Sequence, residues 1–454
     1  MARTIAIETL LDDQPVRRFH IALILSCAAA MFADGFDVQV MGYISPALIH
    51  AWHLDRAALG PALGAGLFGL MIGALVWSPV ADRIGRKPVM LIGLAIFGLM
   101  SLATAFASDL DSMIVLRALT GLGLGGVMPN AVALTSEYAP RRFKTTFVIL
   151  MWFGFTFGSG FGGGIAAALV HAWGWPAAFL FGGILPLLLV PLLAWTLPES
   201  VRILAARRST PDGDARIGAV LRRLDPSVAP DDQFVLVEGG GTSPTILSGL
   251  TGLFEGGRAI VTLLLWIMFF ANLLELYFLG NWMPTLMHDA GLSQETAIIA
   301  TSMIHFGAIF GTLVIGAASD RLNMFRVMTV SYVAAGIFTA LIGRAGSSVP
   351  LGIILGFGAG FFITGGQVCA NALAAQLYPT ASRATGIGWA LGVGRLGSVV
   401  GPVAGGLLLG AGWSIQAVFL AAGLPSLLAA ASVLLLGRIA TPRGGVAAVA
   451  AETS

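Results

Sequence analysis

The chain alternates between long apolar segments and short polar ones. A helix that crosses a bilayer needs about 20 mostly apolar residues, and the pattern repeatedly reaches that length. The predicted membrane-spanning helices are residues 21–43, 57–80, 88–107, 112–134, 145–170, 176–197, 259–286, 294–318, 326–346, 350–375, 384–410 and 414–437. The pattern therefore predicts an all-α membrane protein with twelve transmembrane helices.

One long polar segment, residues 198–258, separates the sixth predicted span from the seventh. We expect turns at 211–214 and 238–244 and an amphipathic helix over 215–224. The segment is too short and too polar to be expected to form a domain with its own core. The predicted organisation is a tail, a six-helix bundle, a central loop, a second six-helix bundle and a second tail, at residues 1–18, 19–197, 198–258, 259–437 and 438–454.

Composition agrees with this pattern. Only 11% of the residues are charged, whereas soluble proteins carry about 25%, so soluble classes are excluded. No small-residue cleavage site follows the first apolar run, and we expect it to stay as a helix instead of being removed as a signal peptide. Cys27 and Cys369 both fall in apolar segments, so the sequence does not indicate a disulfide framework.

The distribution of Lys and Arg sets the expected orientation. With both termini inside, 21 of the 25 Lys and Arg residues lie in inward segments. Arg56 and Arg344 lie in outward loops, and Arg117 and Arg395 lie inside spans. Because cytoplasmic loops are enriched in Lys and Arg, both termini are expected to be cytoplasmic, in a multi-pass protein of the inner (plasma) membrane.

The two halves repeat each other. Asp82-Arg83 after span two recurs as Asp320-Arg321 after span eight, and Pro140 after span four recurs as Pro379 after span ten. The offsets are 238 and 239 residues. Parallel six-helix repeats with a site near the midplane between them are typical of secondary transporters.

The motifs in these repeats resemble those of a known family. The segment DRIGRK at 82–87 resembles the loop signature of the major facilitator superfamily, with Ser78 where glycine is usual. The segment at 117–125, RALTGLGLG, is similar to the superfamily's fourth-helix motif. The stretches at 34–46 and 388–402 are similar to patterns of its aromatic acid:proton symporter branch.

The resemblance implies the major facilitator fold and an importer of an aromatic carboxylic acid, such as a benzoate or hydroxybenzoate, driven by protons through alternating access. A carrier for another organic acid and a drug or metabolite exporter remain alternatives. We favour a cytoplasmic gate as the role of the loop residues, with anchoring by positive charge as the alternative. The candidate gating residues are Asp82, Arg83, Gly85, Arg86, Lys87, Glu137, Arg142, Asp320 and Arg321.

Two carboxylates lie inside the first span, Asp34 and Asp37, three residues apart and so on one helical face. By the helical rise they lie about 20 and 24 Å from the cytoplasmic end. Arg117 in span four comes out at a similar depth, so either acid could pair with it. Acidic residues inside a membrane usually have a functional role. Burial raises the pKa of a carboxylate and a nearby arginine lowers it, and a carboxylate between these two effects is suited to proton coupling. A helix cap at Gly35 and a static ion pair are the alternatives.

Arg395 lies about 16 Å into span eleven. Its planar fork matches a carboxylate, which makes it a candidate substrate clamp. Pairing with Glu275 of span seven, itself a candidate for proton coupling, is the alternative. His305 in span eight either titrates or hydrogen-bonds across helices.

Aromatic and amide side chains at similar depths complete the candidate substrate site, because a flat aromatic acid needs stacking surfaces and hydrogen-bond partners. Together with Arg395, Asp34, Asp37 and His305 they are Trp152, Tyr277, Gln367, Asn371 and Trp389.

The sequence also argues against an enzyme. It contains neither H-E-x-x-H nor G-x-S-x-G, and its glycine strings lie in helices, where they favour close packing over nucleotide binding. We expect no cofactor and no metal. The expected partners are a small aromatic carboxylate, protons and membrane lipid, with no nucleic acid, and the carrier is expected to be a monomer.

Overall fold

The computed structural model describes residues 4–206, 213–225, 227–229, 232–235, 251, 253–255, 257–378 and 382–440. Twelve helical spans in this part are long and apolar enough to cross a membrane, which confirms the predicted number. They are α2 (Arg18–Trp52), α3 (Arg56–Ile84), α4 (Arg86–Thr104), α5 (Leu110–Leu124) with α6 (Val127–Tyr138), α7 (Lys144–Trp173), α8 (Pro176–Thr196), α12 (Ala259–Asp289), α13 (Gln294–Arg321), α14 (Met324–Ile342), α15 (Val349–Leu377), α16 (Arg383–Gly410), and α17 (Ile415–Ala422) with α18 (Leu424–Ala440).

Contacts between residues divide the chain into two compact units. The first unit comprises 1–38, 68–162 and 175–243, and the second comprises 39–67, 163–174 and 244–454. Helices α2, α3 and α7 therefore each contribute one part to the first unit and another part to the second. The division into bundles at 19–197 and 259–437, which follows chain order alone, stays a prediction.

Helices α2 and α7 pack closely in the first unit. A side chain on Gly35 of α2 would overlap the backbone of Phe155, and one on Gly158 of α7 would overlap the backbone of Phe32. Ser159 Oγ also donates a hydrogen bond to the Gly35 carbonyl, at 3.0 Å. Helix α2 continues through Gly35 without a break, so the alternative of a helix cap there is wrong.

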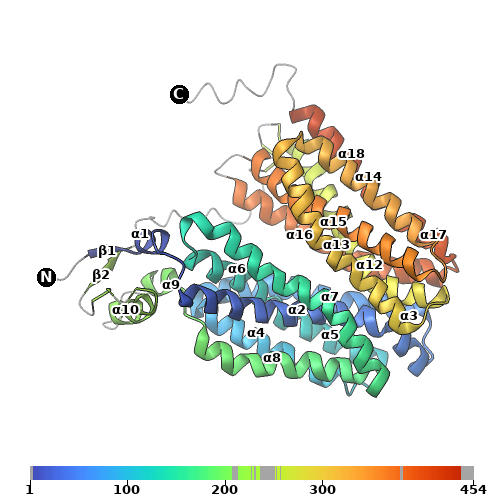
Figure 1. Cartoon of the computed structure of the whole chain (residues 1–454), viewed down its shortest axis with the longest axis horizontal. Coiled ribbons are helices and arrows are strands. Elements are labelled where there is room, and N and C mark those ends of the chain that lie inside the picture. Colours follow the sequence, from blue (N-terminus) through green and yellow to red (C-terminus); the bar gives the residue numbers. More distant parts are fainter. Residues whose placement is uncertain are drawn as a thin grey trace. The chain divides into compact units, whose positions relative to one another are not determined.

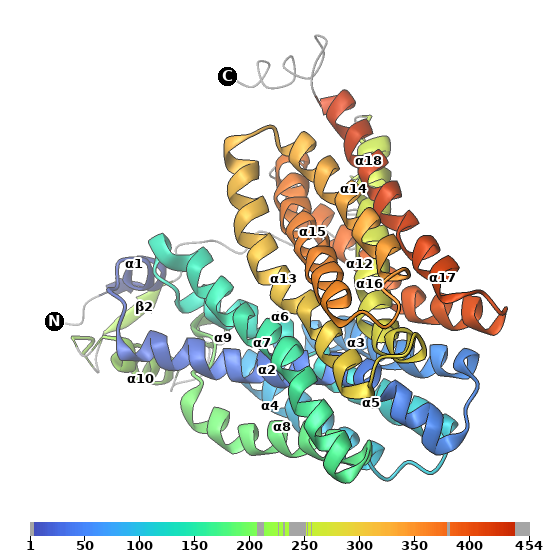
Figure 2. The same cartoon turned by 45° about the vertical axis from the view of Figure 1, so that its right-hand side comes forward.

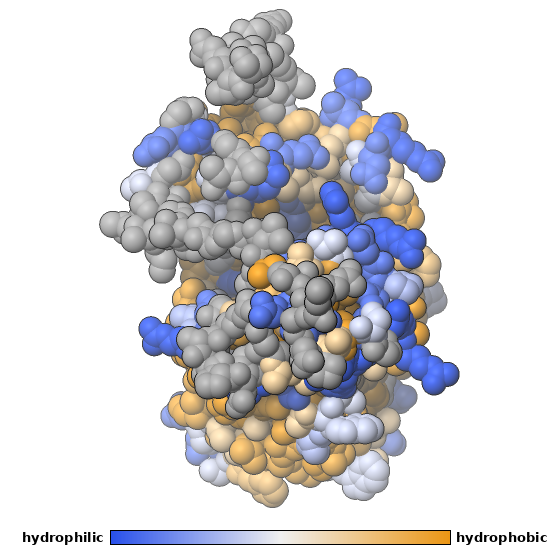
Figure 3. Space-filling model, turned by 90° about the vertical axis from the view of Figure 1, so that its left-hand side faces the viewer, coloured by the Kyte–Doolittle hydropathy of each residue, from blue (hydrophilic) through white to orange (hydrophobic). Residues whose placement is uncertain are grey.

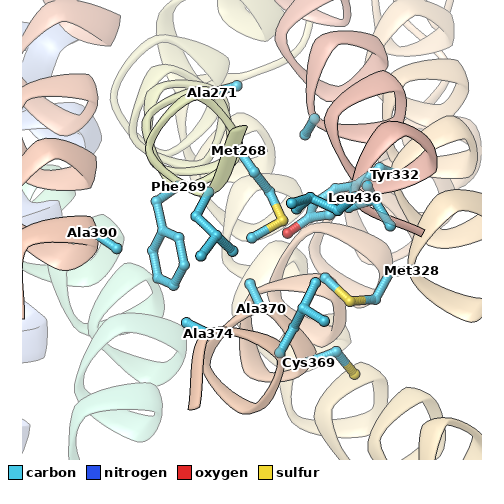
Figure 4. Packing of buried hydrophobic residues seen from close by; sticks show 14 of the residues in the cluster. Met268, Phe269, Ala271, Met328, Tyr332, Cys369, Ala370, Ala374, Ala390 and Leu436 are labelled. Carbon is cyan, nitrogen blue, oxygen red and sulfur yellow. The ribbon is translucent and has the colours of Figure 1, made fainter. Parts of the chain in front are cut away.

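The second unit has a hydrophobic core built from six helices, α12 to α16 and α18 (Figure 4). Met268 and Phe269 of α12 lie there with Tyr332 of α14 and Ala370 of α15, and all four are fully buried. Helix α12 also packs against α16 and α18. This packing positions the polar side chains of α12 that are described below.

The N-terminal segment and the central loop form a small folded layer in the first unit, which we call the N-terminal layer. It consists of β1 (Thr4–Ala6), α1 (Ile7–Asp12), α9 (Val201–Ala206), α10 (Gly213–Leu224) and β2 (Gln233–Val235). The strands β1 and β2 pair in parallel. Figure 1 places both strands with α1 and α10 at the end where the chain begins, and Figure 2 places β2 there with the same two helices. Figure 3 looks onto this end, where hydrophilic residues gather.

Apolar residues of the central loop are buried in this layer, and the expectation that the loop forms no domain with its own core stays a prediction. Ile217 and Leu221 of α10 are fully buried, Phe234 of β2 is almost fully buried, and Ile7 of α1 is fully buried as well. The apolar residues of a short polar segment are thus buried with the help of the N-terminal segment. Helix α10 confirms the predicted amphipathic helix. The turn expected at 211–214 is wrong at its last two residues, which begin α10, and its first two residues lie outside the described part of the chain. The turn expected at 238–244 and most of the C-terminal tail, from 441 on, also lie outside the described residues.

Candidate functional site

The buried centre of the first unit is an ion pair between α2 and α5. Arg117 Nη1 donates to Asp37 Oδ1 at 2.9 Å, and Nη2 donates to Oδ2 at 2.5 Å. Nη2 also reaches the backbone carbonyl of Asp37, at 3.3 Å. Asp37 is fully buried and Arg117 is 2% exposed. Of the two pairings that helical depth allows, the structure therefore adopts the one with Asp37, in the two-pronged geometry that suits arginine.

Aromatic side chains surround this pair. The guanidinium of Arg117 lies 5.4 Å from the centre of the Phe179 ring of α8, close enough for a cation–π contact. Ser101 of α4 donates to the Phe179 carbonyl at 3.3 Å. Phe36 of α2 meets Phe181 edge to face. The arginine is thus held by Asp37 of α2 and by the Phe179 ring of α8.

The balance of buried charge is uneven. Arg117 is the one buried lysine or arginine among the described residues, whereas Asp34, Asp37 and Glu275 are all fully buried. Asp34 lies three residues before Asp37 on the same face of α2. One guanidinium neutralises one carboxylate, and an ionised carboxylate in a dry interior is costly. The role of Asp34, Asp37 and Arg117 in proton coupling stays a prediction.

Arg395 lies in the second unit, on α16, where it is half-buried. Its Nη1 donates to the hydroxyl of Tyr277 on α12, at 3.4 Å. Ser398 donates to the Arg395 carbonyl at 2.6 Å. Tyr277 is 7% exposed, so its hydroxyl and the guanidinium are held together at one edge of α12. A guanidinium and a phenol hydroxyl both donate hydrogen bonds, so together they can hold one carboxylate.

Glu275 does not pair with Arg395. Its Oε1 accepts a hydrogen bond from Thr339 of α14 at 2.6 Å, and its Oε2 accepts one from Ser426 of α18. The alternative in which Arg395 is neutralised by Glu275 is therefore wrong. Glu275 instead connects three helices within the second unit, and its role in proton coupling stays a prediction.

Two further predicted site residues of the second unit have a buried polar atom without a hydrogen-bond partner among the described residues. His305 of α13 is 7% exposed, and its Nε2 has no hydrogen-bond partner among the described residues. Gln367 of α15 is half-buried, and its Oε1 likewise has no partner in the described part of the chain. Both side chains have hydrogen-bonding capacity left for a ligand or for water.

The remaining predicted site residues have other surroundings. Trp389 of α16 stacks on Trp266 of α12, with ring centres 6.0 Å apart, and it packs against the hydrophobic core of the second unit. Trp152 of α7 meets Phe155 edge to face. Asn371 of α15 is exposed. The binding roles of these three residues stay predictions.

The predicted gating residues gather in part. Arg86 Nη1 at the start of α4 donates to Glu137 Oε2 at the end of α6, at 2.7 Å. Lys87 Nζ donates to the carbonyls of Ala194 and Leu197 at the end of α8. The starts and ends of three helices are thereby joined, as a latch between helix ends requires.

Glu199 completes this network and was not anticipated from the sequence. Its Oε1 accepts hydrogen bonds from the backbone N–H groups of Arg86, at 2.9 Å, and Ser200, at 2.7 Å. Gly85 lies directly beside it with φ at +113°, a conformation that favours glycine, and a side chain there would overlap the Glu199 carboxylate. An acid placed directly after an apolar span, where the chain reaches the first turn of a neighbouring helix, is the signal that could have indicated it.

The other gating candidates do not join the network. Asp82 and Arg83 are exposed at the end of α3, and Asp320 and Arg321 are exposed at the end of α13. Arg142 lies over the ring of its neighbour Phe143, at 4.8 Å. The gating role of all these residues stays a prediction. No cluster of His, Cys, Asp and Glu suited to a metal occurs among the described residues.

Comparison with known proteins places this geometry in context. The sequence pattern described as Major Facilitator Superfamily matches residues 27–254 and 265–453. The 4-hydroxybenzoate transporter PcaK of Pseudomonas aeruginosa is 40% identical over 440 residues, which are 97% of each chain. The gallate transporter of Pseudomonas putida is 40% identical over 94% of each chain. The 3-(3-hydroxy-phenyl)propionate transporter of Escherichia coli is 36% identical over 90% of this chain and 92% of its own.

Solved structures share the fold. The xylose transporter XylE from E. coli, in a partially occluded inward-open conformation, matches with a TM-score of 0.72. That match covers 94% of this chain and 99% of the xylose transporter, at 16% sequence identity. The nucleoside transporter NupG, in a mutant form, matches with a TM-score of 0.71 and 15% identity over 92% of this chain and 100% of its own. At such low identity the agreement concerns the fold alone.

Proposed function

We propose that this chain, which belongs to the Major Facilitator Superfamily, imports an aromatic carboxylic acid together with protons across the inner membrane. The family makes the chain a multi-pass membrane transporter and not an enzyme. Relatives that match nearly its whole length transport 4-hydroxybenzoate, gallate and 3-(3-hydroxy-phenyl)propionate. Their substrates share an aromatic ring and a carboxylate, and this shared chemistry supports the same class of substrate here.

The observation that carries the proton part is the buried pair of Arg117 and Asp37 with Asp34 one turn away. Acids buried inside a membrane protein commonly relay protons, and two acids beside one buried guanidinium support such a role for this cluster. In the proposed cycle the cluster takes a proton from outside and releases it inside. The static alternative, a pair that only holds α2 to α5, predicts no link between this cluster and proton movement.

The substrate carboxylate is proposed to lie against Arg395 and Tyr277. Arginine binds carboxylates through two parallel hydrogen bonds, and the Tyr277 hydroxyl is already within 3.4 Å of Nη1. A bound carboxylate would accept from both groups, and the aromatic ring would be left to stack on apolar side chains. In this arrangement Arg395 and Tyr277 bind the carboxylate that these substrates share, and other residues bind the substituents on the ring.

Counterflow in reconstituted vesicles tests the proposal. Vesicles preloaded with 4-hydroxybenzoate should accumulate labelled benzoate, 4-hydroxybenzoate and gallate, whereas succinate should not compete. An inward proton gradient should then concentrate the acid, and a protonophore should abolish accumulation while exchange continues. Competition by succinate equal to that by benzoate would overturn the aromatic assignment. Accumulation that survives the protonophore, or that needs sodium, would overturn proton symport.

A further inference from the structure

A buried amide of α2 has a hydrogen-bond acceptor that the protein leaves unused. Gln39 belongs to the part of α2 that groups with the second unit, and its side chain is 3% exposed. Its Oε1 is buried and has no hydrogen-bond partner among the described residues. Buried polar atoms almost always have a partner, so an unused acceptor in a transporter points to a ligand as the missing donor.

Gly280 of α12 makes the room for this amide. A Cβ built on Gly280 would come within 2.6 Å of Gln39 Oε1 and 3.1 Å of its Nε2. On the next turn of α2, a Cβ on Gly42 would come within 2.9 Å of Asn281 Cα. The two helices therefore cross with their backbones close together, and this crossing fixes the Gln39 amide against the surface of α12.

The same surface of α12 carries the proposed carboxylate site. Tyr277 lies three residues before Gly280, and residues three apart lie on one face of a helix. The Tyr277 hydroxyl in turn accepts a hydrogen bond from Arg395 at 3.4 Å. The unused acceptor of Gln39 and the pair of donors that suits a carboxylate therefore border adjacent turns of α12.

Another buried amide with an unused acceptor, Asn272 of α12, lies on a different side of that helix from Tyr277. Asn272 Oδ1 is also buried without a partner in the described part of the chain, but its Nδ2 is tied to the Ile363 carbonyl of α15 at 3.0 Å. Asn272 lies five residues before Tyr277, which at 3.6 residues per turn is roughly 140° around the helix. It faces α15 and not the side of Tyr277, which makes it a suitable control.

We propose that Gln39 Oε1 accepts a hydrogen bond from a hydroxyl group on the substrate ring, so that this carrier prefers hydroxylated aromatic acids over benzoate. The inference rests on the proposed function, because it requires an aromatic carboxylate at Arg395 and Tyr277. A ring hydroxyl supplies the donor that the amide oxygen lacks, whereas unsubstituted benzoate leaves that oxygen unpaired. Sites built to bind a hydroxyl discriminate strongly against analogues that lack it.

The test compares affinities for benzoate and for the 2-, 3- and 4-hydroxybenzoates in purified protein. The wild-type carrier should bind at least one hydroxybenzoate about ten-fold more tightly than benzoate, the change expected for one hydrogen bond. Gln39→Met keeps the length of the side chain and removes the acceptor. It should abolish this preference while benzoate affinity changes by less than about two-fold. Asn272→Leu should leave the preference as in the wild type, even if its stability falls.

The outcomes separate the two proposals. Benzoate binding by the wild type supports the aromatic assignment, whatever the hydroxyl preference is. A preference that survives in Gln39→Met, or an equal loss for benzoate and hydroxybenzoates, would overturn the role of Gln39 and leave the proposed function standing. Failure of every aromatic acid to bind the wild type would overturn the proposed function itself. Circular dichroism and size-exclusion profiles confirm that Gln39→Met is folded, and Gln39→Leu serves as a second variant.

Discussion

The intramembrane arginines of the two units donate hydrogen bonds to different kinds of group. In the first unit Arg117 meets a carboxylate of the protein itself, Asp37, through two short hydrogen bonds. In the second unit Arg395 donates to a neutral hydroxyl, that of Tyr277, over a longer distance, and the acid Glu275 hydrogen-bonds to Thr339 and Ser426 instead. Under the proposed function, the charge pair of the first unit serves proton coupling and Arg395 of the second unit binds the carboxylate of the substrate.

The largest effect on stability is expected when the buried cation of the first unit, Arg117, is removed. Arg117→Met leaves Asp37 buried without its partner, and breaking a buried ion pair from one side costs about 3–5 kcal/mol. We expect the variant to be poorly folded, measured as its yield and thermal stability in detergent. The matched double variant Arg117→Met with Asp37→Asn removes both charges and should recover most of the stability. A stable single variant would contradict the view that the pair is tightly coupled.

A smaller effect is expected at the arginine of the second unit. Arg395→Lys keeps the charge but loses the planar fork, and binding of an aromatic carboxylate should weaken by about 1–3 kcal/mol. Folding should be little affected, because a lysine at this position keeps the positive charge and a donor for the Tyr277 hydroxyl, to which Arg395 donates in the structure. Isothermal titration with benzoate and benzamide makes the comparison. Equal losses for the acid and the amide would show that Arg395 has a structural role.

The smallest effect is expected outside the membrane spans, at Asp225 of the N-terminal layer. The backbone N–H of Ser227 and the side chain of Gln14 hold the pKa of Asp225 below its usual value. A lowered pKa in the folded state adds stability above the ordinary pKa of aspartate, and this stability is lost as the pH falls through the folded pKa. Asp225→Asn should therefore destabilise the layer by about 0.5–1 kcal/mol near neutral pH.

The measurement for Asp225→Asn is hydrogen exchange of residues 4–12 and 213–235 at several pH values. The difference from the wild type should shrink as the pH falls below about 4, and transport should be unchanged at neutral pH. A difference that grows on acidification would show that the carboxylate is not stabilised in the folded state.

The sequence predicts the parts of this molecule that depend on local pattern. The twelve spans follow from apolar length, and a pairing of Arg117 with one of the two acids of span one follows from counting helical rise along two spans that run in opposite directions. The same depth argument allows Asp34 equally well, because the choice between the two acids depends on side-chain geometry that a rise per residue does not contain.

Contacts between distant segments are what the sequence does not reveal. The pairing of β1 with β2 joins residues more than two hundred positions apart, and three-residue strands have too little alternation to be recognised. Glu199 looks like an ordinary loop acid until the fold brings it to the first turn of α4. The surroundings of Gln39 likewise depend on the helix crossing at Gly280, which no pattern within α2 indicates.

The central claim, that buried acids of the first unit couple a proton to substrate entry, is tested most directly by measuring proton movement itself. Purified carrier is placed in vesicles that contain a pH-sensitive dye, with no initial gradient, and an aromatic acid is added outside. At neutral pH such an acid is almost entirely ionised, since its pKa is about 4. Its entry through the wild-type carrier should therefore acidify the lumen. Asp37→Asn and Asp34→Asn should abolish this acidification, and at least one of them should still exchange labelled substrate. Entry of substrate through the wild type without acidification, or unchanged acidification in both variants, would contradict the account.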